Sequence, residues 1–287
     1  LQEDETLFNY PRSFRLDDGF VTCREIHFNL YAAQAWLARV YWMKGDLDNA
    51  LIYARKVIDS KKFPLEDKLN LRSFLAGVIS GKETIWGVYS TKLLDGIKKN
   101  FYTYDPTFTW LPADDNAALY SVAQEDGNDM RGNEWFRVLL GDNESDKVVR
   151  CMKIVNEAKI STPAEFSSKW IEGINLIRIP EMYLIAAEAL LDKDIELAQD
   201  YFDTFIESRG LFKYKDRPGS PRITLEDIIK ERRKEFVQEG QYFFTLKRGN
   251  MDIYVDALKT ELKGSDELYT LLIPNEEFEY RYTEKDN

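Results

Sequence analysis

The carboxylates of Glu231, Glu235 and Glu239 are the side chains of this sequence whose spacing most suggests chemistry. They lie in the segment ERRKEFVQEGQYFFTLKRG, which runs from Glu231 to Gly249. Residues four apart lie on neighbouring turns of a helix, so Glu235 and Glu239 would be neighbours. Clustered carboxylates can act as general acid and general base, and they can also form ion pairs that hold a helix in place. The residues alone leave both interpretations open.

The rest of the sequence offers little to a catalytic site. His27 is the only histidine, which excludes a His-rich metal site, and no G-x-S-x-G motif accompanies it. Cys23 and Cys151 have no CxxC spacing, and they could form a disulfide or stay buried thiols. A glycoside hydrolase is still an alternative, because it needs two carboxylates across a cleft and the chain has 50 acidic residues. We expect neither a metal nor a cofactor.

Charge and hydropathy exclude other classes of protein. The chain has 39 basic and 50 acidic residues and a formal charge of −11, so its surface repels the phosphates of nucleic acids and carries no polybasic membrane patch. No apolar run reaches the roughly 18–20 residues that a membrane helix needs. The chain opens with LQEDETLFNY, which does not resemble a signal peptide. We therefore expect no nucleic-acid partner and no membrane-spanning segment.

Two pairs of amphipathic helices are predicted. Apolar and small residues recur at helical spacing from Phe28 to Ile58, interrupted at Gly45-Asp46, and again from Met182 to Phe205, interrupted at Asp192 to Ile195. Such pairs are typical of tetratricopeptide-like repeats, although generic amphipathic helices would show a similar spacing. Two pairs are fewer than the roughly three repeats that a free-standing solenoid needs, so other elements must cap them. A peptide-binding repeat scaffold is a further alternative function.

A different region, at about residues 80–175, separates the two pairs. Glu83 to Tyr89 and Lys147 to Val155 are predicted to be short strands, and the intervening stretch YTYDPTFTWLPADDNAALY is rich in aromatic residues, Asp and Pro. Long irregular segments in compact proteins are usually functional or disordered, and this one has too many aromatic residues for plain disorder.

A final helix is predicted to begin at Thr224-Leu-Glu-Asp227, which fits a capping box. Arg232 would lie on the apolar face of this helix, where a guanidinium needs a carboxylate partner, and Glu188 is the candidate. Gly240 would end or interrupt the helix, and Gln241 to Leu246 could be helix or strand.

Five elements in one order resemble the SusD/RagB family, and the agreement covers most of the chain from about residue 20 to 280. They are the signature Lys230 to Phe236 with Glu239-Gly240-Gln241 and Leu246 to Gly249, the helix RIPEMYLIAAEAL from Arg178 to Leu190, the D-x-R element Asn128 to Arg131, the terminal Leu272-Ile273-Pro274 with Glu277, and the helix pair Tyr31 to Ile58.

The chain departs from the family pattern in several places. Thr245 stands where the signature has Asp, and Tyr280-Arg281 lie where an Asn often follows the terminal element. Family members usually carry a long N-terminal portion headed by a lipoprotein signal and a lipidated cysteine, and Cys23, in FVTCREI, lacks the features of such a site. We expect either a truncated chain or a short variant.

The resemblance implies a mainly α-helical fold, a SusD-like α-α superhelix of tetratricopeptide-like pairs with long loops and a few short strands. We expect a single domain over residues 1–287, with the first helix pair at 26–62, a loop-rich, ligand-facing insertion at 80–175, and the second pair with the signature helix at 178–250. Proteins of this family are outer-membrane lipoproteins of Bacteroidetes that bind oligosaccharides or other nutrients without catalysis. They deliver these ligands to a TonB-dependent transporter. The resemblance thus implies a surface-exposed glycan-binding protein at the cell outer membrane, held by a lipid anchor absent from this chain.

The resemblance also divides the candidate residues into two groups. Sugar rings stack on aromatic rings and their hydroxyls bond to polar side chains, although each aromatic could equally pack in a core. The expected ligand contacts are Tyr102, Tyr104, Phe108, Trp110 and Trp135 as stacking residues and Asp114, Asp115 and Asn116 as polar partners. The expected structural group, which holds the last helix on the scaffold, is Arg178, Glu181, Glu188, Glu231, Arg232, Arg233, Glu235, Glu239, Gly240 and Arg248. This favours ion pairs over acid–base catalysis for the clustered carboxylates.

Overall fold

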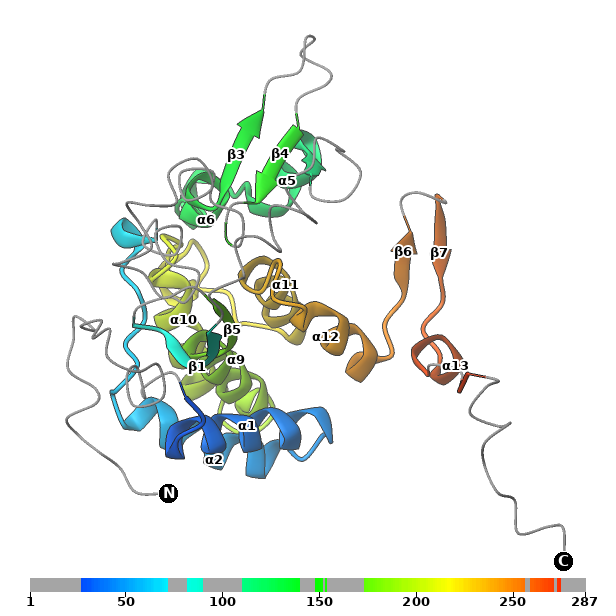
Figure 1. Cartoon of the computed structure of the whole chain (residues 1–287). Coiled ribbons are helices and arrows are strands. Elements are labelled where there is room, and N and C mark those ends of the chain that lie inside the picture. The colour runs from blue at the N-terminus through cyan, green and yellow to red at the C-terminus, as the bar shows by residue number, and fades with distance from the viewer. Residues whose placement is uncertain are drawn as a thin grey trace, which may run out of the picture. The chain divides into compact units, whose positions relative to one another are not determined.

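The computed structural model describes residues 27–71, 82–89, 110–139, 148–151, 153, 173–255, 259–270 and 273–274. The chain divides into two compact units, Leu1–Glu239 and Gly240–Asn287, which we describe separately. Helices predominate in the described residues, as Figure 1 shows, and this confirms the predicted mainly α fold class. The expectation of one domain over the whole chain stays a prediction.

The first predicted helix pair is present as α1 (Leu30–Met43) and α2 (Leu47–Asp59). Gly45, with φ of 78°, makes the turn between them. The side chain of Asp46 caps α2 by accepting a hydrogen bond from the backbone N–H of Asn49 at 3.1 Å. Small side chains at the helix–helix contact let the two backbones approach closely, and those that are buried are Ala32, Ala35, Ala38, Ala50 and Ala54.

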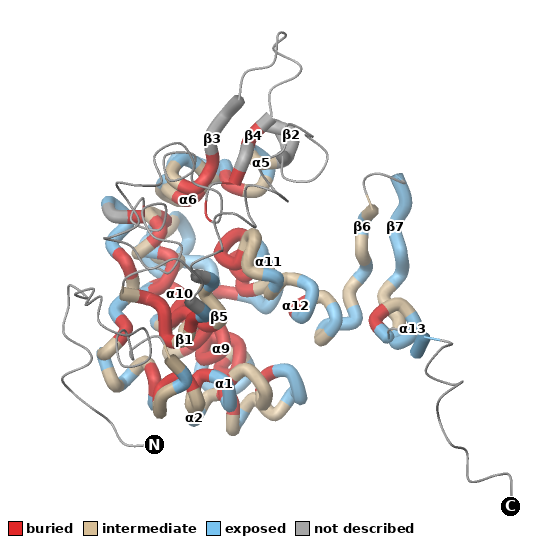
Figure 2. Tube along the Cα trace, in the orientation of Figure 1, coloured by how far each residue is buried: buried red, intermediate tan, exposed pale blue. Residues whose placement is uncertain are grey.

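The second pair is α9 (Ile179–Leu190) and α10 (Ile195–Glu207), and it repeats the local chemistry of the first. Asp194 caps α10 through the backbone N–H of Leu197 at 3.1 Å, as Asp46 caps α2. A buried alanine, Ala198, follows Asp194 at the distance at which Ala50 follows Asp46. Helix α9 packs against both α2 and α10 and is buried along almost its whole length, as Figure 2 shows.

A two-stranded antiparallel sheet marks the boundaries of the region between the helix pairs. Strand β1 (Thr84–Tyr89) pairs with β5 (Gly173–Arg178), and Thr84 lies opposite Arg178. The strand expected at Glu83 to Tyr89 is therefore confirmed. Because the strands are antiparallel neighbours, the intervening chain leaves the helical scaffold and returns to it at the same place. We call residues 90–172 the insertion and β1–β5 its neck.

The described part of the insertion is more regular than the sequence suggested. Strands β2 (Trp110–Pro112), β4 (Val148–Cys151) and β3 (Phe136–Leu139) form an antiparallel sheet in the order β2-β4-β3. Helices α5 (Ala113–Tyr120) and α6 (Met130–Glu134) accompany it. The expectation of a loop-rich region over residues 80–175 stays a prediction, and the sequence did not indicate these elements because strands of three or four residues and helices of five or eight are too short to show periodicity. Their core consists of Leu71, Tyr120, Trp135, Phe136, Val149 and Cys151.

Helix α11 (Leu225–Glu235) closes the first unit and begins with the predicted capping box. Thr224 accepts from the backbone N–H of Asp227 at 3.2 Å, and the Asp227 carboxylate accepts from the backbone N–H of Thr224 at 2.8 Å. Short 3₁₀ turns lie at Lys68–Asn70 (η3), Gln124–Asp126 (η4) and Tyr214–Asp216 (η6).

The second unit contains the segment whose secondary structure the sequence left open. Residues from Gln241 form helix α12 (Gln241–Gly249), which Gly240 precedes with φ of 70°. Strands β6 (Ile253–Val255) and β7 (Thr260–Leu262) pair antiparallel, and the short helix α13 (Asp266–Tyr269) follows. Within the described ranges of both units, no helix is long and apolar enough to cross a membrane.

Candidate functional site

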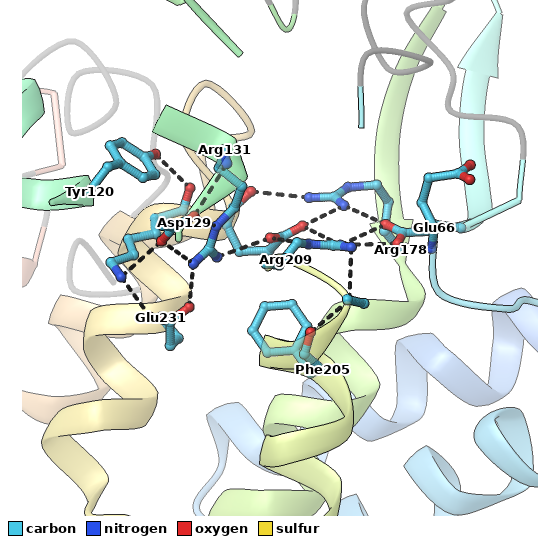
Figure 3. A network of polar contacts seen from close by, with 12 residues as sticks. Glu66, Tyr120, Asp129, Arg131, Arg178, Phe205, Arg209 and Glu231 are labelled. Atoms are coloured by element: carbon cyan, nitrogen blue, oxygen red, sulfur yellow. Dashed lines mark hydrogen bonds and ion pairs between the residues drawn. The ribbon is translucent and has the colours of Figure 1, made fainter. Parts of the chain in front are cut away.

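Charged side chains of the insertion, the neck and helix α11 meet in one buried network, which Figure 3 shows from close by. The insertion contributes two residues at the start of α6 and one residue two positions after β4. The neck contributes its two ends, and a further member lies two positions after the end of α10. We call this set the ion network. Its described members are the carboxylates of Glu83, Asp129, Glu231, Glu235 and Glu239 and the cations of Arg131, Lys153, Arg178, Arg209 and Lys234.

Glu235, at the end of α11, lies at the centre of the ion network. Its carboxylate accepts hydrogen bonds from Arg178 Nη1 at 2.8 Å, from Arg209 Nη2 and Nε at 2.9 and 3.0 Å, and from Arg131 Nη1 at 3.2 Å. Burial alone would raise the pKa of Glu235, but the facing guanidinium groups of Arg209 and Arg178 outweigh it and hold the pKa far below its usual value. This carboxylate is therefore ionised at every physiological pH.

Arg131 joins the insertion to helix α11. Its Nε and Nη2 donate to the two oxygens of Asp129 at 2.8 and 2.7 Å, and Nη2 also donates to Glu231 Oε2 at 2.6 Å. Lys234 Nζ bridges the same two carboxylates at 3.0 and 2.9 Å. Burial opposes ionisation of Asp129, but Arg131 and Lys234 outweigh it and lower its pKa. The D-x-R element noted in the sequence is thus an ion-paired unit of the fold.

Lys153 and Arg178 complete the ion network at the neck. Arg178 donates to Glu83 Oε2 at 2.9 Å and to Glu239 Oε1 at 2.7 Å. Lys153 Nζ donates to Glu239 Oε1 at 2.5 Å and to the backbone carbonyl of Glu235 at 2.8 Å. Its burial lowers the pKa of the Lys153 ammonium, an effect that Glu239 partly offsets. Lys153 of the insertion and Arg178 of the neck are thereby both tied to Glu235 and Glu239, at and just beyond the end of α11.

The network balances its charges and leaves little for acid–base chemistry. Its five described carboxylates face five described cations, so no net charge is buried among them. A general acid needs a carboxyl pKa raised towards the working pH, and the pKa values of Glu235 and Asp129 are lowered instead. The arrangement fits a structural role, since a buried carboxylate is stable only when it is paired and hydrogen-bonded.

A second buried ion pair joins α11 to the two helix pairs. Arg232 Nη2 lies 3.9 Å from Glu188 Oε2, so the pairing predicted from the sequence is confirmed. The guanidinium also lies over the indole ring of Trp42, 4.1 Å from its centroid, and Trp42 Nε1 donates to Glu188 Oε2 at 2.7 Å. Glu181, another residue of the family signature, pairs with Arg39 at 2.5 and 2.7 Å.

The remaining signature residues do not belong to the ion network. Arg233 is exposed on α11, Gly240 is an exposed turn residue, and Arg248 is half-buried in the second unit. Sequence reasoning in turn missed Glu83, Lys153, Arg209 and Lys234 as members. It noted Asp129 and Arg131 only as part of a family element and did not expect their ion pairs. Lys234 lies inside the quoted signature, but no spacing rule shows that its ammonium is buried. The other three come from separate parts of the chain, and only the folded neck brings them together.

The structure tests few of the residues expected to contact a ligand. Tyr102, Tyr104 and Phe108 lie outside the described residues, and so do the side chains of Trp110, Asp114 and Asp115, although their backbones belong to β2 and α5. Asn116 is half-buried on α5, and its buried side-chain oxygen has no hydrogen-bond donor among the described residues.

Trp135 requires a correction. The sequence suggested a stacking residue of the ligand face, but the ring is 0% exposed and belongs to the core of the insertion. The ammonium of Lys153 lies 4.2 Å from its ring centroid. A ring enclosed in this way offers no free face to a sugar. The physical reason for its position is that burial of a large apolar indole ring stabilises the fold.

Solved structures of SusD superfamily proteins are similar to this chain. One from Bacteroides thetaiotaomicron VPI-5482 is 25% identical with a TM-score of 0.63, covering 88% of this chain and 59% of its own. One from Bacteroides vulgatus ATCC 8482 is 21% identical with a TM-score of 0.61, covering 86% and 56%. A SusD-like carbohydrate binding protein from the same strain is 18% identical with a TM-score of 0.59, covering 96% and 61%. The chain therefore spans less than two thirds of the length of these relatives.

The comparison with protein families agrees with the structural one. No match is found among curated proteins. The sequence model of the SusD family matches residues 97–281, a stretch that contains most of the insertion, the second helix pair and the signature segment. Since this match covers more than half of the 287 residues, the chain belongs to the SusD family.

Proposed function

We propose that this protein binds glycans without catalysis and delivers them to a TonB-dependent transporter at the outer-membrane surface, held there by a lipid anchor in the full-length protein. The observation that carries the proposal is membership of the SusD family across the insertion and the signature segment. Two structures of similar fold bear descriptions of the same kind, a SusD-like carbohydrate binding protein and a surface glycan-binding protein A from Bacteroides uniformis. The latter has a TM-score of 0.52 and 20% identity.

The junction of β2 and α5 supplies suitable chemistry for a sugar. Strand β2 runs directly into α5, so Trp110 and the polar residues Asp114, Asp115 and Asn116 follow one another at one end of the sheet. An indole ring can stack on the apolar face of a sugar, and the acceptors can bond to its hydroxyls. The buried Asn116 oxygen has no donor among the described residues, and a sugar hydroxyl could donate to it.

The first test compares two tryptophans. Binding of soluble starch, xylan and mucin oligosaccharides is measured by isothermal titration calorimetry for the wild type, for Trp110→Ala and for Trp36→Ala. Trp36 is a matched control, because it is a partly exposed tryptophan on α1, outside the insertion. We expect Trp110→Ala to weaken binding at least about tenfold and Trp36→Ala to leave it unchanged. Loss of binding in Trp36→Ala alone would move the site to α1, and absence of binding across a full glycan array would refute the proposal.

Catalysis and partnership need separate measurements. Steady release of reducing sugar from any bound glycan would show that the protein is a glycoside hydrolase and not a binding protein without catalysis. Affinity for peptide tails without affinity for glycans would favour the repeat-scaffold alternative. Co-purification of the full-length protein with a TonB-dependent transporter would support delivery, and its absence under conditions that preserve glycan binding would remove that part of the proposal.

A further inference from the structure

The insertion is joined to the helical scaffold by a contact independent of its neck. Residues 126–130, which lead into the first residue of α6, run beside the segment that follows α10. The backbone N–H groups of Asn128 and Met130 donate to the carbonyls of Gly210 and Arg209 at 3.0 and 2.9 Å, and the N–H of Phe212 donates to the carbonyl of Asp126 at 2.8 Å. This contact fixes the position of the chain just before α6, at a distance from the β1–β5 strands in sequence.

Arg131 follows this backbone contact directly in the sequence, and its side chain links this part of the insertion to α11. Within the described residues its guanidinium donates four hydrogen bonds, two to Asp129 beside it and one each to Glu231 and Glu235 on α11. The side chain is 0% exposed, so no ligand in solution touches it. Helix α6 ends where β3 begins, and β3 pairs with β4, which pairs with β2. The orientation of β2 and α5 therefore follows from that of α6.

The packing of α5 reinforces the same path. Gly132 of α6 lies so close to Tyr120 at the end of α5 that an added Cβ would meet the Tyr120 Cβ at 2.7 Å. The Tyr120 hydroxyl donates to the backbone carbonyl of Lys234 at 2.8 Å. Both short helices of the insertion thus rest on the last two turns of α11. The signature helix, which contains no expected ligand contact, forms the base on which the expected ligand face is built.

We infer that Arg131 is a positioning residue for ligand binding: by anchoring α6 to Glu231 and Glu235, it sets the orientation of the β2–α5 junction that carries Trp110 and Asn116. The inference rests on the proposed function for the identity of the ligand face, while the anchoring itself does not. Binding sites on short elements lose affinity when their supporting side chains are loosened by even a small displacement. A lysine keeps the charge of Arg131 but cannot reproduce the planar arrangement of donors that reaches three carboxylates at once.

The test uses Arg131→Lys with Arg39→Lys as its matched control. Arg39 forms a comparable, largely buried pair, bonded to both oxygens of Glu181 and to the carbonyl of Leu176, and none of these partners belongs to the described part of the insertion. Each variant is compared with the wild type by hydrogen–deuterium exchange of the peptides that cover residues 127–139. Its affinity is measured for whichever of soluble starch, xylan and mucin oligosaccharides the wild type binds. All measurements are made at least 15 °C below the melting temperature of the variant.

Arg131→Lys is expected to accelerate exchange in α6 and β3 and to weaken glycan binding about tenfold or more, while Arg39→Lys changes neither, even where it lowers the melting temperature. Unchanged exchange and unchanged affinity in Arg131→Lys would overturn the inference, as would equal loss in Arg39→Lys. If Arg131→Lys does not fold, Glu231→Gln removes one of the same bonds more gently and should shift both readouts in the same direction.

The result that would refute the proposed function differs from the result that would refute the anchoring by Arg131. A wild type that binds no glycan would refute the proposed function and the affinity part of this inference together. The exchange comparison would still decide whether Arg131 anchors α6, because it needs no ligand.

Discussion

At the scale of the residue, guanidinium groups determine how this fold buries its charges. Arg131, Arg178 and Arg209 each contact more than one carboxylate in the ion network, which a lysine cannot do with the same geometry. The two lysines of the network instead bridge groups that lie close together, as Lys234 does between Asp129 and Glu231. The division follows from shape, because a planar fork serves several partners and an ammonium acts as a point charge.

Arg232 gives the clearest test of a single buried cation. Substitution Arg232→Ala leaves the Glu188 carboxylate with one fewer counter-charge and removes the stacking on Trp42, so we expect a loss of about 3–5 kcal/mol in the free energy of unfolding. Lys230→Ala is the control, since Lys230 is exposed on the same helix and lysine and arginine have nearly the same helix propensity. Urea denaturation at pH 7 measures both. Equal stabilities of the two variants would show that the pair with Glu188 contributes nothing.

At the scale of the element, the sequence predicted best what depends on neighbours along the chain. The capping box at Thr224, the αL turn at Gly45 and the strand beginning at Thr84 all follow from local chemistry, and all are present. The second helix of each pair, α2 and α10, begins with the same kind of aspartate cap, so the two pairs resemble each other in local chemistry. The helix α12 was left undecided, because an aromatic run of six residues suits a helix or a strand equally well.

The elements that could not be predicted depend on contacts between distant segments. The sheet β2-β4-β3 joins strands separated by long stretches of chain, and the strands have only three or four residues. The ion network likewise unites side chains from the neck, the insertion, α10 and α11. From the sequence, Glu235 and Arg178 were expected to hold the last helix on the scaffold. Their bonds to partners near the insertion, and the burial of Trp135, became visible only with the three-dimensional arrangement.

The backbone of Gly210 lies so close to that of Asn128 that a side chain at Gly210 should disturb the packing of the two segments. Gly210 has φ of +93°, and a Cβ there would lie 2.3 Å from the carbonyl oxygen of Asn128. Gly219 also has a positive φ, of +78°, but a Cβ added there would have no atom of the described residues within 4 Å. Gly210→Ala should therefore destabilise the protein by about 1–3 kcal/mol more than Gly219→Ala, because both share the backbone strain and only the first adds a steric clash.

Urea denaturation of the two glycine variants measures this difference. The extra loss in Gly210→Ala should be accompanied by faster hydrogen–deuterium exchange at Asn128 and Met130, whose N–H groups donate across the contact. If both variants lose the same stability, the segment after α10 can move away from the insertion without cost, and the backbone contact would not fix α6.

At the scale of the whole molecule, the net charge of the chain differs from the net charge of its buried ion network. The chain carries a formal charge of −11, yet the described members of the ion network are electrically balanced. The excess of acidic residues therefore belongs to side chains outside the described network. Stability at neutral pH depends on keeping the buried carboxylates ionised, since protonation of one of them would leave a buried cation with one fewer partner.

Acid should destabilise the fold through these carboxylates. Asp129 and Glu235 have pKa values below 3.8 and 4.5, the values that such groups have when unperturbed, because Arg131 and Arg209 with Arg178 outweigh their burial. Between the folded and unfolded pKa values the unfolded chain binds more protons, so the free energy of unfolding falls as the pH falls below about 4.5 and is insensitive to these two groups above pH 6.

Urea denaturation at intervals from pH 7 to pH 3 measures the slope, and Glu235→Gln is the comparison that assigns it. The variant is less stable at pH 7, because Arg178 and Arg209 lose a counter-charge, and it has no carboxyl at this position to protonate. Its free energy of unfolding should therefore fall less steeply below pH 4.5 than that of the wild type, and the two curves should converge in acid. Parallel curves would show that Glu235 has the same pKa in the folded and unfolded chain, and the acid sensitivity would then belong to carboxylates outside the centre of the network.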